Sequence, residues 1–150
     1  MPEADPFQLS RFVHAQDPVY ADVLDELRQG RKQTHWMWFI FPQFKGLGHS
    51  ATAKSFAINS LDEARAYLRH PVLGPRLIEC ARLVASISNR TVSSIFGYPD
   101  DLKFRSSITL FARVSDDPLF EQLLARHFDG QPDPKTIAIL NDDGRLSAGG

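Results

Sequence analysis

Four Asp-Pro pairs constrain the fold of this 150-residue chain more than any other sequence feature. An aspartate carboxylate accepts hydrogen bonds from the free backbone N–H groups in the first turn of a helix. Proline fits the first helical position because the N–H that it lacks would have no partner there. Apolar residues at helical spacing follow each pair, and Gly30 and Gly130 stand where two of these helices should end. The pattern predicts helices after Asp5-Pro6, Asp17-Pro18, Asp117-Pro118 and Asp133-Pro134.

Helical signals also fill the middle of the chain. Ser60 and Glu63 form a capping box, in which the Glu63 carboxylate is expected to reach back to the Ser60 N–H. Further helices are predicted over about 72–88 and from Asp100 or Asp101 onward, and only the run Trp36–Phe41 resembles a strand. The sequence therefore predicts an all-α fold, a compact single-domain bundle of about 7–9 short helices with no substantial sheet. This domain should span residues 1–140, with a flexible C-terminal tail over 141–150.

Composition narrows the class of protein and its compartment. A 43% hydrophobic and 23% charged content is typical of globular domains and excludes a disordered or fibrous chain. The single cysteine, Cys80, cannot form an internal disulfide, which favours a reducing cytoplasm. The sequence shows neither a signal peptide nor an apolar run near the ~20 residues that span a bilayer. The five histidines lack metal-ligand spacing, which argues against a metal site. Taken together, these features predict a cytoplasmic protein with no membrane partner, no metal and no cofactor.

A net charge of −1 conceals a basic centre between acidic ends. Residues 28–113 contain 13 Lys and Arg against 5 Asp and Glu, which gives +8, and no carboxylate lies between Glu26 and Asp62. The overall balance argues against nucleic acid as a partner, because nucleic-acid-binding domains are generally basic. The basic centre instead points to a small anionic ligand, and nothing in the sequence identifies a protein partner.

An aromatic segment inside this basic centre has two open interpretations. Two tryptophans and three phenylalanines between positions 36 and 44 can supply most of a core, or can line the floor of a ligand pocket. Indole and imidazole N–H groups need hydrogen-bond partners if they are buried. The candidate ligand-binding residues of the segment are His35, Trp36, Trp38 and Gln43.

A glycine-rich turn follows the aromatic segment. The stretch Gly46-Leu47-Gly48-His49-Ser50 precedes a predicted helix that carries Lys54. Exposed backbone N–H groups and the helix dipole both favour an anion at such a place, although the Gly-Lys-Ser/Thr ending of a P-loop is absent. The candidate ligand-binding residues here are Lys45, Gly46, Gly48, Ser50 and Lys54. The alternative is a plain loop with a helix N-cap.

A second polar cluster follows the turn at Tyr98-Pro99. Asp101 and Lys103 are candidate catalytic residues, with Ser106 and Ser107 as further ligand-binding candidates. A carboxylate that orients water would allow hydrolysis without a metal. The same residues also fit a helix cap and a solvated helix face, so the sequence does not decide whether this protein is an enzyme.

Three long motifs occur in the order of a known family. These are Thr34–Gln43 with the glycine-rich turn, His70-Pro71-x-Leu73-Gly74-x-Arg76-Leu77, and the stretch Phe96–Phe111. They resemble the bacterial family catalogued as domain of unknown function 1810, whose members are sometimes mislabelled calpastatin. The resemblance covers about residues 5–140 and implies a small all-helical fold, but no established activity.

Two classes of function remain open from the sequence. The first is a cytoplasmic domain that binds a small anionic ligand, such as a nucleotide or an ADP-ribose-like molecule, in an aromatic and basic pocket, with metal-independent hydrolysis as its enzymatic form. The second is a non-enzymatic protein-interaction module that uses a basic patch. They differ in whether the basic and aromatic residues converge on a cleft or cover a convex surface.

Overall fold

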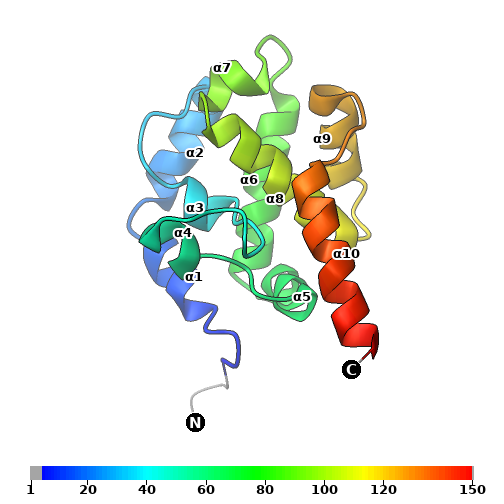
Figure 1. The fold of residues 1–150 in the computed structure, drawn as a ribbon. Coiled ribbons are helices and arrows are strands. Elements are labelled where there is room, and N and C mark those ends of the chain that lie inside the picture. The colour runs from blue at the N-terminus through cyan, green and yellow to red at the C-terminus, as the bar shows by residue number, and fades with distance from the viewer. Residues whose placement is uncertain (1–4, 150) are drawn as a thin grey trace.

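Ten helices make up the regular structure of the described residues in a computed structural model of the chain (Figure 1). The structure describes residues 5–149, with side chains for residues 5–143. The helices are α1 Ser10–Gln16, α2 Tyr20–Gln29, α3 Met37–Ile40, α4 Ala51–Ser55, α5 Leu61–Arg69, α6 Leu73–Ser86, α7 Val92–Phe96, α8 Asp100–Val114, α9 Leu119–Phe128 and α10 Pro134–Gly149. The predicted all-α class is confirmed, with slightly more helices than expected.

Two of the Asp-Pro pairs cap their helices as predicted. The Asp117 carboxylate accepts the Leu119 N–H at 2.9 Å, and the Asp133 carboxylate accepts the Thr136 N–H at 3.0 Å. α2 begins at Tyr20 without a side-chain cap, because the Asp17 carboxylate instead pairs with a guanidinium from α6 at 2.8 Å. α2 ends as predicted at a left-handed glycine, Gly30, whose φ is 74°.

Two segments differ from the sequence-based expectation, and a third stays untested. The Ser60 hydroxyl accepts the Glu63 N–H at 3.0 Å, but the Glu63 carboxylate binds the N–H of Asn59 at 3.1 Å instead of that of Ser60. The strand-like run Trp36–Phe41 forms the one-turn helix α3, since Met37 and Ile40, three residues apart, are buried together. Residues 141–149 continue helix α10, and the flexibility of this tail stays a prediction.

The helices pack around α6 and α8. α3, α5 and α9 each contact both of these long helices, α2 covers α6, and α7 and α10 cover α8 (Figure 1). An aromatic cluster fills the centre, where the Phe104 ring lies 4.8 Å from Phe96 and 5.0 Å from Phe41. Offset and edge-to-face pairs of this kind add about 0.5–1.5 kcal/mol each to the apolar burial.

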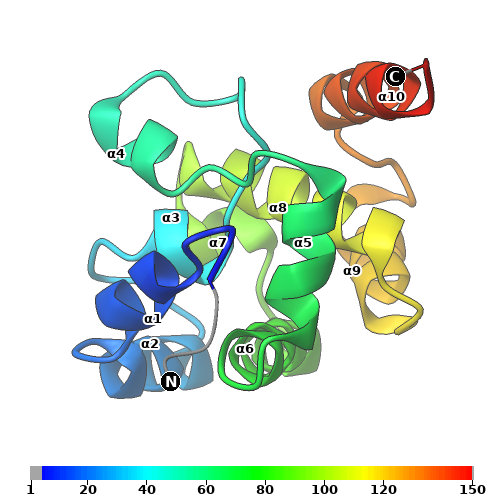
Figure 2. The same cartoon turned by 90° about the horizontal axis from the view of Figure 1, so that it is seen from below.

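The site described below depends on where α4 and α10 lie relative to α8. Figure 2 shows α4 and its preceding loop on one side of α8 and α10 on the other. Two hydrogen bonds fix the start of α10 against α8, one between the Ser106 and Thr136 hydroxyls at 2.8 Å and one from the Asp133 N–H to Thr109 Oγ1 at 2.9 Å. α8 therefore forms the floor between two separately anchored walls.

Candidate functional site

A cleft with two adjoining cavities lies between the loop before α4, helix α4, helix α8 and the start of α10. The larger cavity has a volume of about 540 Å³ and the smaller one about 230 Å³. Residues that line both cavities, here called the junction residues, are Trp38, Gln43, Gly48, His49 and Ala53. Ligand sites in proteins are concave, with volumes of about 300–1,000 Å³, so the two cavities together have the size of a small-molecule site.

A short backbone pairing builds the wall of the smaller cavity. The Ile58 N–H donates to the Gln43 carbonyl and the Lys45 N–H donates to the Ile58 carbonyl, both at 2.9 Å. Phe44 and Ile58 form an isolated parallel bridge and are both buried. Gln43 and Lys45 flank the buried Phe44, and all three residues line the smaller cavity.

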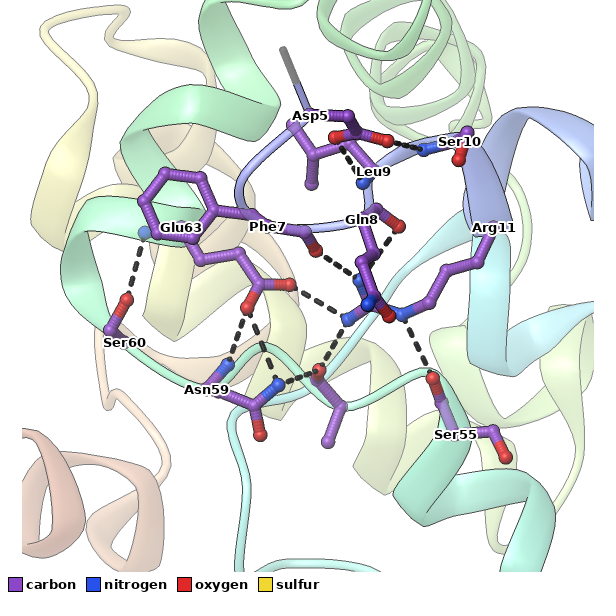
Figure 3. Close-up of polar contacts among 11 residues, drawn as sticks. Asp5, Phe7, Gln8, Leu9, Ser10, Arg11, Ser55, Asn59, Ser60 and Glu63 are labelled. Carbon is purple, nitrogen blue, oxygen red and sulfur yellow. Dashed lines mark hydrogen bonds and ion pairs between the residues drawn. The ribbon is translucent and has the colours of Figure 1, made fainter.

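Arg11 anchors the other half of this pairing (Figure 3). Its guanidinium donates to the carbonyls of Ser55 and Ala57 at 2.9 and 2.8 Å, and to the buried Glu63 carboxylate at 2.8 Å. It also donates to two carbonyls at the N-terminal side of α1. Arg11 therefore holds the segment that contains Phe56 and Ala57, which line the smaller cavity.

Trp38 borders both cavities and carries a cation on its ring. Lys103 Nζ lies 4.7 Å from the Trp38 ring centroid and 3.4 Å from Asp100 Oδ1. The other oxygen of Asp100 lies 2.8 Å from Nζ of Lys32, which is only 8% exposed. The Lys32 pair is the shorter and more buried one, so Lys103 is the second cation on a carboxylate that already has a closer partner.

Two further cations and one carboxylate line the larger cavity. The Arg105 guanidinium donates to the carbonyls of Gln131 and Pro132 through Nε and Nη2 at 2.9–3.2 Å. Lys135 is exposed and has no ion pair among the described residues. Among the described residues, the only carboxylate in the lining is that of Asp133, which accepts two hydrogen bonds from Thr136 through Oδ2. The free charge of the larger cavity is therefore positive.

Two glycines of the predicted turn are explained by the backbone of the cleft. Gly46 has a φ of 92°, in the region that glycine adopts without strain. A Cβ on Gly48 would lie 2.5 Å from the Ala53 Cβ, so only glycine allows the loop to pass this close to α4. Ser50 caps α4 by accepting the Ala53 N–H at 3.0 Å.

The structure brings most of the sequence-predicted site residues together. Those that line the cleft are Trp38, Gln43, Lys45, Gly46, Gly48, Ser50, Lys54, Lys103 and Ser106. Among the others, Trp36 is buried in the core and its indole N–H donates to the Glu26 carboxylate at 3.0 Å. His35 is exposed and lines neither cavity.

The two candidate catalytic residues lie apart. The Asp101 carboxylate accepts a hydrogen bond from the Ser93 hydroxyl at 2.9 Å, on the side of α8 that faces α7. The Lys103 ammonium instead lies over the Trp38 ring. Residues two positions apart on a helix point about 200° away from each other, which accounts for this separation. Ser107 is buried without a hydrogen-bond partner for its hydroxyl among the described residues, and it lines neither cavity.

Among the lining side chains that sequence reasoning missed, three carry a basic group, namely His49, Arg105 and Lys135. His49 lies inside the glycine-rich turn, and Arg105 directly precedes the predicted Ser106, so proximity to predicted residues could have identified both. Lys135 lies at the start of α10, and only the tertiary contact between α10 and α8 brings it to the cleft.

Other reactive groups lie elsewhere. Cys80 is fully buried in α6, and burial raises the pKa of its thiol to about 12, which keeps the sulfur protonated. In the part of the chain that the structure describes, no three His, Cys, Asp or Glu side chains gather to hold a metal ion.

None of the helices within residues 5–149 has the length and apolar character needed to cross a bilayer.

Fold and cleft together define a helical domain with a basic, aromatic cleft, and comparison with known proteins places it in a family. The family described as "Protein of unknown function (DUF1810)" matches residues 6–140, so the chain belongs to this family. A solved structure, the conserved hypothetical protein Rv1873 from Mycobacterium tuberculosis, is 55% identical to it, with a TM-score of 0.90. That match covers 91% of this chain and 99% of the other. No curated protein matches.

Proposed function

We propose that this protein binds a small anionic ligand with a planar group, of the nucleotide or ADP-ribose-like class, in the cleft around Trp38. The observation that carries the proposal is the imbalance of charge in a concave site. Among the described residues, five cationic side chains line the two cavities against one carboxylate, which is already hydrogen bonded. The cations are Lys45, Lys54, Lys103, Arg105 and Lys135. Such clefts attract anions and raise their association rates.

The aromatic part of the proposed site is Trp38. It is half-buried, and its indole N–H has no hydrogen-bond partner among the described residues, whereas the Trp36 indole is buried and satisfied by Glu26. A planar base can stack on an accessible indole, and stacking contributes about 1–3 kcal/mol per base. The amide of Gln43 and the imidazole of His49 lie at the same junction and can donate to the ligand.

The geometry supports binding better than hydrolysis. Asp101 faces Ser93 outside the cleft, and Asp133 is engaged by Thr136. A general base must be within hydrogen-bond reach of the water it activates. The catalytic roles of Asp101 and Lys103 therefore stay predictions from the sequence, and the proposed function does not depend on them.

One observation favours the alternative, a protein-interaction module. Tyr98 and Leu102 are 82% and 51% exposed, and Leu102 lies beside Pro99 on the outer wall of the larger cavity. Exposed large apolar side chains next to a basic cleft are typical of a protein-binding surface.

A thermal-shift titration with AMP, ADP and ADP-ribose tests the proposal. A ligand at about 100 times its Kd adds about 2.7 kcal/mol to the free energy of unfolding, and this corresponds to a rise in Tm of at least about 5 °C. The double variant Lys54→Ala/Lys135→Ala, which removes one cation from each cavity, should reduce the rise. Arg69→Ala, which removes an exposed cation on α5 outside the cleft, serves as the control. If no anionic nucleotide raises the Tm, and a protein partner is captured that Leu102→Ser releases, the interaction module is the correct function.

A further inference from the structure

The cations of the cleft lie at two ends, with the aromatic junction between them. Lys45 and Lys54 line the smaller cavity and not the larger one. Lys103, Arg105 and Lys135 line the larger cavity and not the smaller one. Trp38 borders both cavities. A ligand whose planar group lies against Trp38 therefore has positive charge on either side of it.

Cations at both ends are available to a ligand. Lys45 and Lys54 are exposed and have no ion pair among the described residues, and the same holds for Lys135 at the other end. Lys103 can leave Asp100 without leaving that carboxylate unpaired, because Lys32 Nζ remains 2.8 Å away. Neither end of the cleft is therefore neutralised by the protein itself.

A phosphate seated in one cavity meets only the cations that line that cavity. Charge-assisted hydrogen bonds between ammonium or guanidinium groups and phosphate oxygens require about 2.7–2.9 Å between heavy atoms. The two sets line different cavities, so a phosphate seated in the larger cavity beside Lys135 leaves Lys54, which lines only the smaller cavity, without an anion. The adjacent phosphates of ADP or ADP-ribose form one centre of charge, so they too contact mainly the cations of one cavity.

We propose that the ligand is a nucleoside flanked by two separate phosphates, with its base on Trp38 and one phosphate in each cavity. This chemistry occurs in a free nucleoside 3′,5′-bisphosphate and in a nucleotide inside a single-stranded nucleic acid. The inference rests on the proposed function and specifies the substrate class of the same site. The two cavities, about 230 and 540 Å³, match a ligand of this size.

Isothermal titration calorimetry at constant ionic strength tests the inference with four probes: AMP, ADP, adenosine 3′,5′-bisphosphate and a 5′-phosphorylated adenosine trinucleotide. The bisphosphate unit, free or in the trinucleotide, should bind at least about tenfold more tightly than AMP and ADP. Preference for the free compound or for the trinucleotide identifies the source of the ligand.

Two single variants probe the two ends. Lys54→Ala and Lys135→Ala should each weaken bisphosphate binding by about tenfold, while only one of them should weaken AMP binding. Both side chains are exposed and unpaired, so both variants should fold, and Arg69→Ala is the control. Equal affinity for ADP and the bisphosphate, or sensitivity to one variant only, overturns the two-ended ligand and leaves the proposed function standing. The absence of binding by all four probes overturns both.

Discussion

The two tryptophans provide a sharp test of the division between core and cleft. Trp36 is 1% exposed and donates its indole N–H to Glu26 at 3.0 Å, whereas Trp38 is half-buried and lacks a hydrogen bond. Truncating a buried tryptophan to alanine costs about 3–5 kcal/mol through lost transfer free energy and the remaining cavity. A hydrogen bond to a charged group contributes about 1.5–3 kcal/mol. We therefore expect Trp36→Ala to lower the free energy of unfolding by at least about 4 kcal/mol.

Trp38→Ala should be much milder. It removes partial apolar burial and the Lys103 ammonium–ring contact at 4.7 Å, and such contacts contribute about 0.5–1 kcal/mol at exposed sites. We expect a loss of about 1–2 kcal/mol, so the two variants should differ by at least about 2 kcal/mol. Far-UV circular dichroism during urea unfolding measures this difference without depending on indole fluorescence.

A matched variant keeps the test decisive if Trp36→Ala does not fold. Trp36→Phe preserves an aromatic ring and removes the donor to Glu26, which retains three other hydrogen bonds, so a loss of about 1.5–3 kcal/mol is expected. Trp38→Phe should cost less than 1 kcal/mol by the same reasoning. Equal losses for the Trp36 and Trp38 variants would refute the assignment of one tryptophan to the core and the other to the cleft.

Three further perturbations test how the cleft's supports are held. Burial acts to raise the pKa of Glu26, but the hydrogen bonds to its carboxylate outweigh this effect and keep the pKa below its ordinary value of 4.5. The free energy of unfolding should therefore fall as the pH drops below about 4.5. Urea titrations in acid should show a shallower fall for Glu26→Gln. Arg11→Met should cost about 3 kcal/mol in urea unfolding because it strands the buried Glu63 carboxylate, and adding Glu63→Met should restore part of that loss. Gly74→Ala should lower the free energy of unfolding by at least about 1 kcal/mol despite the better helix propensity of alanine, since its Cβ would lie 2.1 Å from the Leu68 carbonyl oxygen; an increase in stability would contradict the close α5–α6 contact.

Local signals predicted the helices well because their chemistry is local. The carboxylates of Asp117 and Asp133 cap α9 and α10, and Gly30 ends α2 in the left-handed conformation. The capping box failed in one detail, since Arg11 comes from a distant segment to hold Glu63. A local sequence pattern cannot predict a partner such as Arg11, which lies far from Glu63 in the sequence.

The candidate site was predicted in part for the same reason. Gln43 and Lys45 were identified from their place in a carboxylate-free segment, and the structure turns both toward the cleft. Composition alone could not separate Trp36 from Trp38, because their burial depends on which side of a one-turn helix faces α6 and α8. Lys135 reaches the cleft only through the contact between α8 and α10.

The most direct test of ligand binding in the cleft is a two-dimensional ¹⁵N NMR titration with adenosine 3′,5′-bisphosphate, following the two indole N–H resonances. The Trp38 indole borders both cavities, and the Trp36 indole is buried against Glu26. We predict a saturable shift of the Trp38 resonance, together with the backbone resonances of Gln43 and Lys45, while the Trp36 resonance stays nearly unchanged. A spectrum that stays unchanged in the cleft at millimolar ligand, or shifts confined to residues outside it, would contradict the proposed site.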